Sequence, residues 1–306
     1  MIEINSILCP IDFSAFSERA LAYAMKMAVW YGAKLQVLHV MPPLPPSTTS
    51  ELAETSRQLT RRNLEKTVER YRLPAADVAT ELMESAEPAA RILECADSCD
   101  ADLIVTGSHG RSGVQRVLLG SVVEPLLHRC SRPVLTVPSH VDPSHGTRVI
   151  SFSRIVCAID FSPSSLNALA HALSIAEETN SALTLLHVIE KPPELSHAPQ
   201  PPDFDVAPIR VKAEAAAHER LRELIPEQAR DYCTIETAVL EGGVSRQLLR
   251  MASARNADLI VLGVHGRSAF DLAFFGSNSK DVIREAHCPV LVVPASRRRT
   301  AVRVAS

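Results

Sequence analysis

The sequence repeats itself, and this repeat constrains the fold more than any other feature. The stretch ILCPIDFSAFSERALAYAMKMA from Ile7 aligns without gaps on IVCAIDFSPSSLNALAHALSIA from Ile155. Further matches follow in the same order: LQVLHV with LTLLHV, ADLIVTGSHGRS with ADLIVLGVHGRS, and RPVLTVP with CPVLVVP. A chain of 306 residues also has room for two domains of about 100 to 200 residues each. We therefore predict a duplicated domain, with copies at residues 1–140 and 152–295.

Segments outside the apolar repeats carry the residues of loops and linkers. Pro, Gly and Ser in SHVDPSHGTRVIS, residues 139–151, indicate a linker between the copies. MPPLPPSTTS and EKPPELSHAPQPPDFD are so rich in proline that we interpret them as loops rather than as polyproline motifs for a partner. The basic tail, residues 296–306, lacks aromatic residues and has no basic partner elsewhere, so we predict a disordered, solvated end.

Within each copy, short apolar runs alternate with longer stretches of helical period. The first copy predicts strands near 5–11, 35–40, 77–83, 102–106 and 133–137, and helices near 15–31, 51–71, 87–98 and 121–130. In the second copy Ser162 is the predicted cap of a helix with Pro163 in its first turn. LIVTG and LIVLG are apolar on both faces, which is typical of parallel strands covered by helices on each side. We expect an α/β fold: two tandem, doubly wound, Rossmann-like domains with five parallel strands each, in the order 3-2-1-4-5.

Charge and cysteine content exclude several classes of protein. The formal net charge is only -3, and acidic and basic residues are mixed, which argues against a nucleic-acid or membrane-surface partner. We find neither a signal-peptide pattern nor an apolar run near the roughly 18 residues of a membrane span, so we predict a cytoplasmic protein. Cys9, Cys157 and Cys288 lie in or beside apolar segments, as buried thiols do. Cys95 and Cys99 share a predicted helix face without further ligands at suitable spacing, so we predict no metal site.

The strand order predicts where a ligand binds. Doubly wound sheets bind ligands outside the carboxyl ends of their strands, where the winding direction reverses. The order 3-2-1-4-5 brings Asp12, after the first strand, beside Gly107, after the fourth. Glycine there lets the backbone turn tightly and expose amide N–H groups to phosphate oxygens. Ser121 is the predicted N-cap of the next helix, whose free N–H groups favour an anion.

These residues carry a family resemblance. GSHGRSGVQRVLLGS from Gly107 and GVHGRSAFDLAFFGS from Gly263 share G-x-x-G, nine residues, then G-S, after a strand. This constellation resembles the ATP-binding branch of the universal stress protein family, and the resemblance covers both copies nearly end to end. It implies an ATP site, with or without Mg²⁺. The first-strand Asp then lies near ribose and adenine, a Val ending the second strand helps to form the adenine slot, and the glycine motif holds the phosphates. The implied site residues are Asp12, Val40, Gly107, Gly110, Gly120, Ser121 and Val122 in the first copy, and Asp160, Val188, Gly263, Gly266, Gly276 and Ser277 in the second.

Each assignment has a structural alternative. Asp12 and Asp160 can instead satisfy backbone groups at the start of the next helix. Val40 and Val188 can be ordinary core residues, and Ser121 with Glu124 forms the pattern of a capping box, which is useful without a ligand. The copies also differ, because Asp271 replaces Gln115 and places a carboxylate near any triphosphate in the second copy. We therefore predict the tighter site in the first copy.

The sequence favours binding over catalysis. No P-loop, no dinucleotide fingerprint and no nucleophile elbow is present, so we expect at most slow ATP hydrolysis. The leading hypothesis is a nucleotide-binding, stress-response regulator that acts on unknown protein partners. The alternative is a scaffold of the same fold that binds no nucleotide, and a third reading is an adenylyl-transferring enzyme. In the family, strands such as PVLTVP and PVLVVP pair between domains, which implies an internal pseudo-dimer and allows a homodimer.

Overall fold

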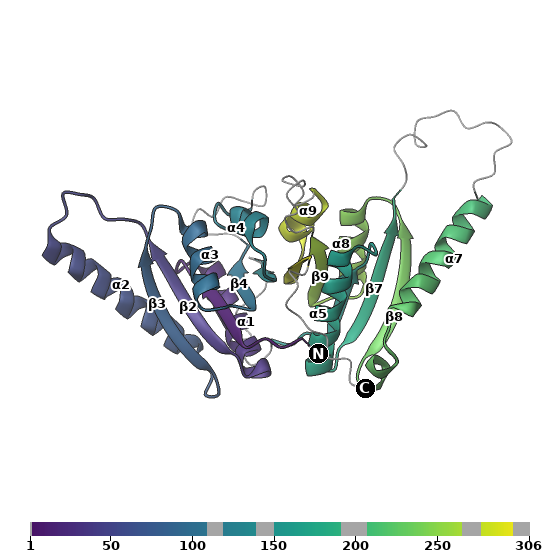
Figure 1. Ribbon diagram of the computed structural model, residues 1–306, viewed down its shortest axis with the longest axis horizontal. Helices are drawn as coiled ribbons and strands as arrows, with labels where there is room; N and C mark the ends of the chain where they lie inside the picture. Colours follow the sequence, from purple (N-terminus) through teal and green to yellow (C-terminus); the bar gives the residue numbers. More distant parts are fainter. Residues whose placement is uncertain (1, 109–118, 139–149, 191–206, 265–276, 296–306) are drawn as a thin grey trace, which may run out of the picture.

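The computed structural model describes residues 2–108, 119–138, 150–190, 207–264 and 277–295, and these form a single sheet with helices on both faces (Figure 1). The first half contains β1 (Ser6–Pro10), α1 (Ala15–Tyr31), β2 (Lys34–Met41), α2 (Ser50–Tyr71), β3 (Asp77–Glu84), α3 (Pro88–Ser98), β4 (Leu103–Gly107), α4 (Val123–Arg129) and β5 (Val134–Val137). The second contains β6 (Arg154–Ala158), α5 (Pro163–Thr179), β7 (Ala182–Ile189), α7 (Ala207–Glu223), the 3-10 helix η3 (Glu227–Asp231), β8 (Thr234–Glu241), α8 (Val244–Ala254), β9 (Leu259–Val264), α9 (Ser277–Glu285) and β10 (Val290–Pro294). The α/β fold predicted from the sequence is confirmed, while most of the predicted linker, most of the second proline-rich segment and the tail lie outside the described residues.

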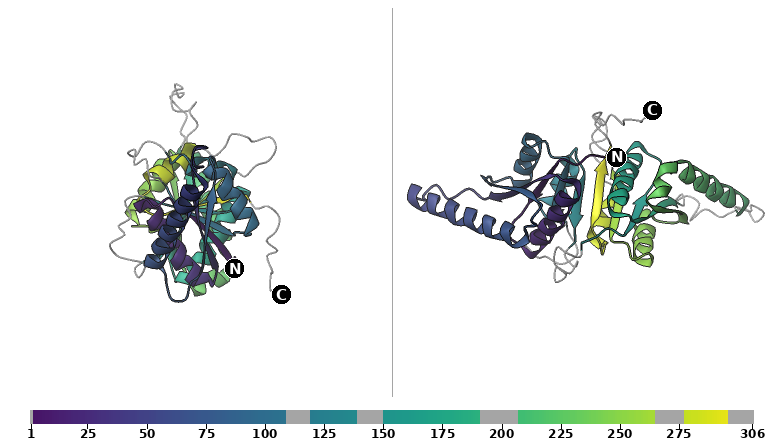
Figure 2. Two further views of the ribbon diagram at one scale, coloured as in Figure 1. Left: turned by 90° about the vertical axis from the view of Figure 1, so that its left-hand side faces the viewer. Right: turned by 90° about the horizontal axis from the view of Figure 1, so that it is seen from below.

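The strands form one ten-stranded sheet in the order β3-β2-β1-β4-β5-β10-β9-β6-β7-β8. The first half therefore has the predicted order 3-2-1-4-5, and the second half repeats it. Strands within each half are parallel, whereas β5 and β10 pair antiparallel at the centre, where the two halves meet (Figure 2). This is the pairing that the family resemblance implied for the two edge strands, and it leaves β3 and β8 as the outer edges.

Two apolar cores, one on each face of the sheet, continue from one half into the other. The first lies beneath α1, α2, α5 and α7 and includes Met25, Leu64, Ile175 and Leu221. The second lies beneath α3, α4, α8 and α9 and includes Ile92, Leu126, Leu248 and Val282. Because both cores cross the junction, the halves fold against each other as one body.

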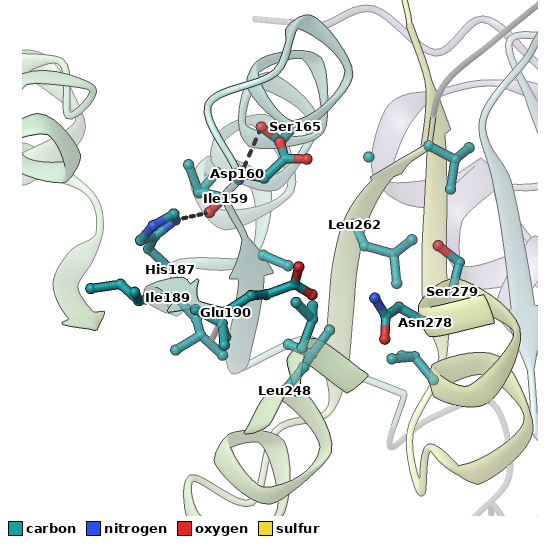
Figure 3. Close-up of a pocket in the computed structure, with 17 residues that line it drawn as sticks. Ile159, Asp160, Ser165, His187, Ile189, Glu190, Leu248, Leu262, Asn278 and Ser279 are labelled. Atoms are coloured by element: carbon teal, nitrogen blue, oxygen red, sulfur yellow. Dashed lines mark hydrogen bonds between the residues drawn. The ribbon is translucent and has the colours of Figure 1, made fainter. Parts of the chain in front are cut away.

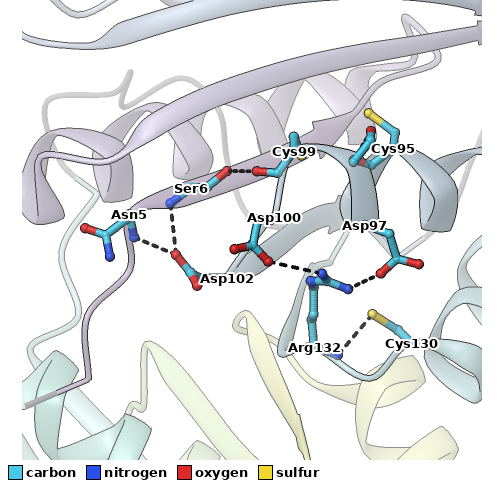
Figure 4. A network of polar contacts seen from close by, with 10 residues as sticks. Asn5, Ser6, Cys95, Asp97, Cys99, Asp100, Asp102, Cys130 and Arg132 are labelled. Carbon is cyan, nitrogen blue, oxygen red and sulfur yellow. Dashed lines mark hydrogen bonds and ion pairs between the residues drawn. The ribbon is translucent and has the colours of Figure 1, made fainter. Parts of the chain in front are cut away.

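The amino ends of the strands are fixed by a carboxylate that occurs in both halves. Asp102 Oδ2 accepts hydrogen bonds from the backbone nitrogens of Asn5 (2.7 Å) and Ser6 (3.1 Å) (Figure 4). Asp258 does the same for Ser153 and Arg154 in the second half. Figure 4 also shows Arg132 between Asp97 and Asp100, which ties the end of α3 to the segment before β5. These contacts lie at the amino ends of the strands, whereas the predicted ligand site is at the carboxyl ends, so we interpret them as structural.

The helix cap predicted in the second half is confirmed, whereas the cap predicted in the first half is wrong. Ser162 caps α5 by accepting a hydrogen bond from the Ser165 nitrogen (3.2 Å), and Pro163 is the first helical residue, as predicted. The prediction that Ser121 caps the next helix of the first half is wrong. The cap of α4 is Val122, without a side-chain hydrogen bond, and Ser121 lies in the turn before it. The capping box does not form, because Ser121 is not the cap residue, and Glu124 accepts a hydrogen bond from Lys280 of the other half.

The cysteines form no disulfide bonds. All seven are free, and Cys9, Cys157 and Cys288 are buried as expected, which raises the pKa of each thiol. Across the described ranges, no group of three His, Cys, Asp or Glu side chains is arranged to hold a metal ion. In the same ranges, every helix is too short or too polar to cross a membrane.

We expect His171 to make the fold sensitive to mild acid. This α5 side chain is half-buried, and desolvation lowers its pKa from 6.5 to about 4. Below pH 6.5 the unfolded chain binds a proton that the folded chain does not, so the free energy of unfolding falls as pH falls and levels off near pH 4. Between pH 8 and pH 5, His171 alone lowers the free energy of unfolding by about 2 kcal/mol. Urea unfolding at both pH values measures it. His171→Gln should reduce the pH dependence by that amount, and an unchanged dependence would contradict the assignment.

Candidate functional site

A cavity of about 350 Å³ opens at the carboxyl ends of β1 and β4 in the first half. It lies at the switch point of the sheet, where β1 and β4 are neighbours but their connections run to opposite sides. Its lining comes from the ends of β1, β2 and β4, the first turns of α1 and α3, and the start of α4 with the turn before it. The lining residues are Pro10, Ile11, Asp12, Ser17, Val40, Pro88, Ile92, Thr106, Gly107, Gly120, Ser121, Val122 and Val123.

Asp12 is held in place by the first turn of α1. Its Oδ1 accepts hydrogen bonds from the Ser14 nitrogen (3.0 Å) and the Ser14 hydroxyl (2.5 Å). Its own backbone nitrogen donates to Ser17 Oγ (3.2 Å). The structural alternative for Asp12 is therefore real, since the carboxylate satisfies a backbone group at the start of the helix. Asp12 also lines the cavity, so the contact with Ser14 holds this residue at the cavity wall.

The turn around Asp12 contains residues that the sequence reasoning missed. Phe13 has φ 63, a left-handed conformation that is rare for a residue with a large side chain. Its ring lies 4.3 Å from the His39 ring, and His39 Nδ1 contacts the Ile11 carbonyl oxygen at 2.7 Å. Phe161, His187 and Ile159 repeat the arrangement in the second half. The repeated blocks DFS and LHV were the signal that could have identified this supported turn.

Gly107 has a packing reason that the sequence did not suggest. A Cβ added there would lie 3.0 Å from the backbone carbon and oxygen of Phe16 in α1. The glycine therefore lets α1 approach the end of β4 closely, while it also lines the cavity. Gly120 is connected to the same strand end, because its nitrogen donates to the Ser108 oxygen (3.3 Å). Both ends of the glycine motif thus meet beside β4.

The second half has a larger cavity, about 580 Å³, in the corresponding place. Asp160, Val188 and Gly263 line it, so this half also brings its predicted strand-end residues together. Figure 3 shows Asp160 and Glu190 on one side of the cavity and Asn278 and Ser279, from α9, on the other. Asp160 Oδ1 accepts a hydrogen bond from the Ser162 nitrogen (2.9 Å), as Asp12 does from Ser14.

The two cavities differ in electrostatics. Asp160 and Glu190 both line the second cavity, whereas Asp12 is the one acidic side chain among the described residues that line the first. Ala158 stands in the second cavity where Pro10 stands in the first. The second site therefore has more open space and more negative charge.

Some predicted site residues cannot be placed. Gly110, Gly266 and Gly276 lie outside the described residues, as does Asp271 of the second glycine loop. Ser277 is the first residue of α9. The remaining predicted residues lie together in their cavities: Asp12, Val40, Gly107, Gly120, Ser121 and Val122 in the first, and Asp160, Val188 and Gly263 in the second.

The fold and the cavities define a duplicated, doubly wound α/β protein with one cavity at the switch point of each half. The model of the universal stress protein family matches residues 3–138 and again residues 151–294. The chain therefore belongs to the universal stress protein family, in a tandem form.

Several known proteins are similar to this chain over its whole length or over part of it. A universal stress protein of Mycolicibacterium smegmatis is 29% identical over 297 residues, covering 94% of this chain and 96% of the relative. A crystal structure of a universal stress protein from Archaeoglobus fulgidus superposes with a TM-score of 0.66 at 22% identity, over 96% of this chain and 100% of that one. Another universal stress protein, 25% identical, was solved in complex with cAMP; it covers 45% of this chain and 98% of its own, with a TM-score of 0.36.

Proposed function

We propose that this protein binds an adenine nucleotide, ATP with or without Mg²⁺, in the crevice of its first half. The observation that carries the proposal is the meeting of six of the seven implied first-copy residues in one cavity: Asp12, Val40, Gly107, Gly120, Ser121 and Val122. These residues are distant in sequence, and the switch point of the sheet is where ligands of this fold bind. The volume, about 350 Å³, lies within the range of small-molecule sites.

The chemistry of the cavity walls suits the parts of a nucleotide. Val40, Pro88 and Ile92 supply apolar surface for a flat base. The Asp12 carboxylate can accept hydrogen bonds from ribose hydroxyls, and the turn at Ser121 and Val122 offers backbone N–H and hydroxyl donors to phosphate. Micromolar affinity requires about 8 kcal/mol, more than one helix end or one hydrogen bond supplies, so these contacts must act together.

The first half should hold the nucleotide more tightly than the second. Glu190 adds a second carboxylate to the wall of the second cavity, which disfavours an anionic ligand. The bound protein would then act as a stress-response regulator, in which occupancy of the first crevice changes contacts with protein partners. The competing function is a scaffold of the same fold whose cavities bind no nucleotide.

Nucleotide that remains bound through purification tests the proposal. The purified chain is denatured, and the supernatant is assayed for adenine nucleotide. Asp12→Asn keeps an oxygen that can accept from the Ser14 nitrogen, whereas Asp12→Ala removes the charge and the acceptor. We expect nucleotide from the wild-type chain, less from Asp12→Asn and none from Asp12→Ala, while Asp160→Asn in the second half changes little. No nucleotide from the wild-type chain, with no thermal shift on addition of ATP and Mg²⁺, would favour the scaffold.

A further inference from the structure

The strand pairing at the junction between the halves has local two-fold symmetry. In the antiparallel pairing of β5 with β10, Leu135 lies opposite Leu291, and these two leucines are equivalent positions of the repeat. Thr136 then pairs with Val290 and Val134 with Val292, which are reciprocal pairs. A residue on this axis must therefore meet its own equivalent from the other half, as in a symmetric dimer.

At one contact between equivalent positions, the two side chains carry opposite charges. Glu124 and Lys280 each lie four residues after the last glycine of the repeated motif, so they are equivalent positions. They lie on α4 and α9, which face each other across the junction (Figure 1). Lys280 Nζ donates to Glu124 Oε1 at 2.6 Å, and this contact lowers the pKa of Glu124. Equivalent positions thus carry opposite charges and meet directly.

The charged side chains beside Glu124 and Lys280 do not oppose the contact between them. Arg284 is the second-half equivalent of His128, and it contacts Asp281 and Glu285 of its own helix, both at 2.8 Å. Among the described residues of α9, Lys280 therefore supplies the positive charge that contacts Glu124. On the first half, His128 Nε2 lies 3.8 Å from the same Glu124 oxygen. The described α4 and α9 residues at this contact thus place an acid from one half against a base from the other.

The opposite face of the sheet shows a second asymmetry at the junction. Phe152, which precedes β6 and is fully buried, packs against Tyr23 (ring centroids 5.9 Å apart) and Trp30 (5.6 Å) of α1. The equivalent of Phe152 in the first half is Ile4, and the repeat places His171 and Glu178 at the positions of Tyr23 and Trp30. This aromatic contact therefore also needs one half of each kind.

We propose that Glu124 and Lys280 form a recognition pair that selects the pairing of unlike halves over the pairing of like halves. The central surface of the first half, β5 with α4, then fits the β10 and α9 surface of a second half rather than another copy of itself. Two first halves would place Glu124 against Glu124, and two second halves would place Lys280 against Lys280. The proposal concerns the junction alone and does not depend on nucleotide binding.

Charge reversal in the full-length chain recreates each unwanted contact within one molecule. Glu124→Lys produces the Lys–Lys contact of two second halves, and Lys280→Glu produces the Glu–Glu contact of two first halves. The double reversal restores an opposite pair in the other orientation. Amide hydrogen exchange of β5 and β10 reports directly on the junction, because these strands pair across it. Matched controls are Glu65→Lys and Lys66→Glu on the exposed surface of α2.

We expect each single reversal to speed amide hydrogen exchange in β5 and β10 by about threefold to tenfold, because it replaces a partly exposed ion pair by a repulsive contact. The double reversal should return exchange to nearly the wild-type rate, and about 1 M salt should reduce the differences. The controls should leave these strands unchanged. Single reversals that exchange like the wild type, or a double reversal that exchanges as fast as the worse single variant, would overturn the proposal.

Discussion

Replacing Gly263 by alanine is expected to lower the free energy of unfolding by about 3 kcal/mol or more, the upper range for overpacking a close contact. A Cβ on Gly263 would lie 2.5 Å from the Ser164 carbonyl oxygen and closer still to the adjoining backbone atoms of Ser164 and Ser165. These are backbone atoms of the first turn of α5, so no side-chain rotation relieves the clash. The helix must move away from the end of β9, and the contacts of α5 with the apolar core weaken.

The same substitution elsewhere in the chain supplies graded controls. Gly107→Ala meets Phe16 at 3.0 Å in the first half, so we expect a smaller loss of about 1 to 2 kcal/mol. Gly243 has an ordinary backbone conformation (φ -74), and a Cβ added there would meet open space, so Gly243→Ala should change the free energy of unfolding by less than about 1 kcal/mol. Urea unfolding of the three full-length variants measures the order. Equal stabilities for Gly263→Ala and Gly243→Ala would contradict the packing role of the strand-end glycine.

Replacing Val40 by phenylalanine is expected to weaken ATP binding by at least about tenfold, which is about 1.4 kcal/mol. Val40 ends β2, packs partly against the second core and lines the first cavity. A phenyl ring at this position occupies space that we assign to the adenine base. Because the larger side chain extends toward the cavity, the fold should be retained, and an unfolding curve checks this directly.

Val188→Phe is the matched variant in the second half. Val188 lines the larger cavity at the equivalent strand end, so the same change tests whether that site contributes to binding. Thermal shift measurements over a range of ATP concentrations should show a large loss for Val40→Phe and little change for Val188→Phe. The reverse order would place the tighter site in the second half and contradict our reading of Glu190.

The repeat and the apolar runs predicted the fold closely, because both signals are local. Every predicted strand and helix of the first half agrees with the structure to within two residues. Buried parallel strands are continuous apolar runs, and amphipathic helices show their period within a few turns. The switch-point argument then placed Asp12 beside Gly107, and these residues do line one cavity.

Contacts between distant segments were the part that sequence could not supply. The apparent capping box at Ser121 does not form, because the cap is Val122, and Glu124 instead contacts Lys280, which is 156 residues away in the chain. The packing reason for Gly107 depends on how closely α1 crosses β4, a distance that no local pattern encodes. Likewise, Phe13 and His39 belong to different elements, and only their repetition in the second half signals that they form one supported turn.

The central claim is that the first crevice is an adenine nucleotide site, and calorimetric titration of the nucleotide-free, full-length chain with ATP and Mg²⁺ tests it most directly. We predict saturable binding with one tighter site per chain, lost in Val40→Phe and retained in Val188→Phe. Absence of saturable heat up to about 1 mM ATP, a ligand level that corresponds to only about 4 kcal/mol of binding, would contradict the account. Two equal sites would retain the nucleotide but contradict the inequality of the halves.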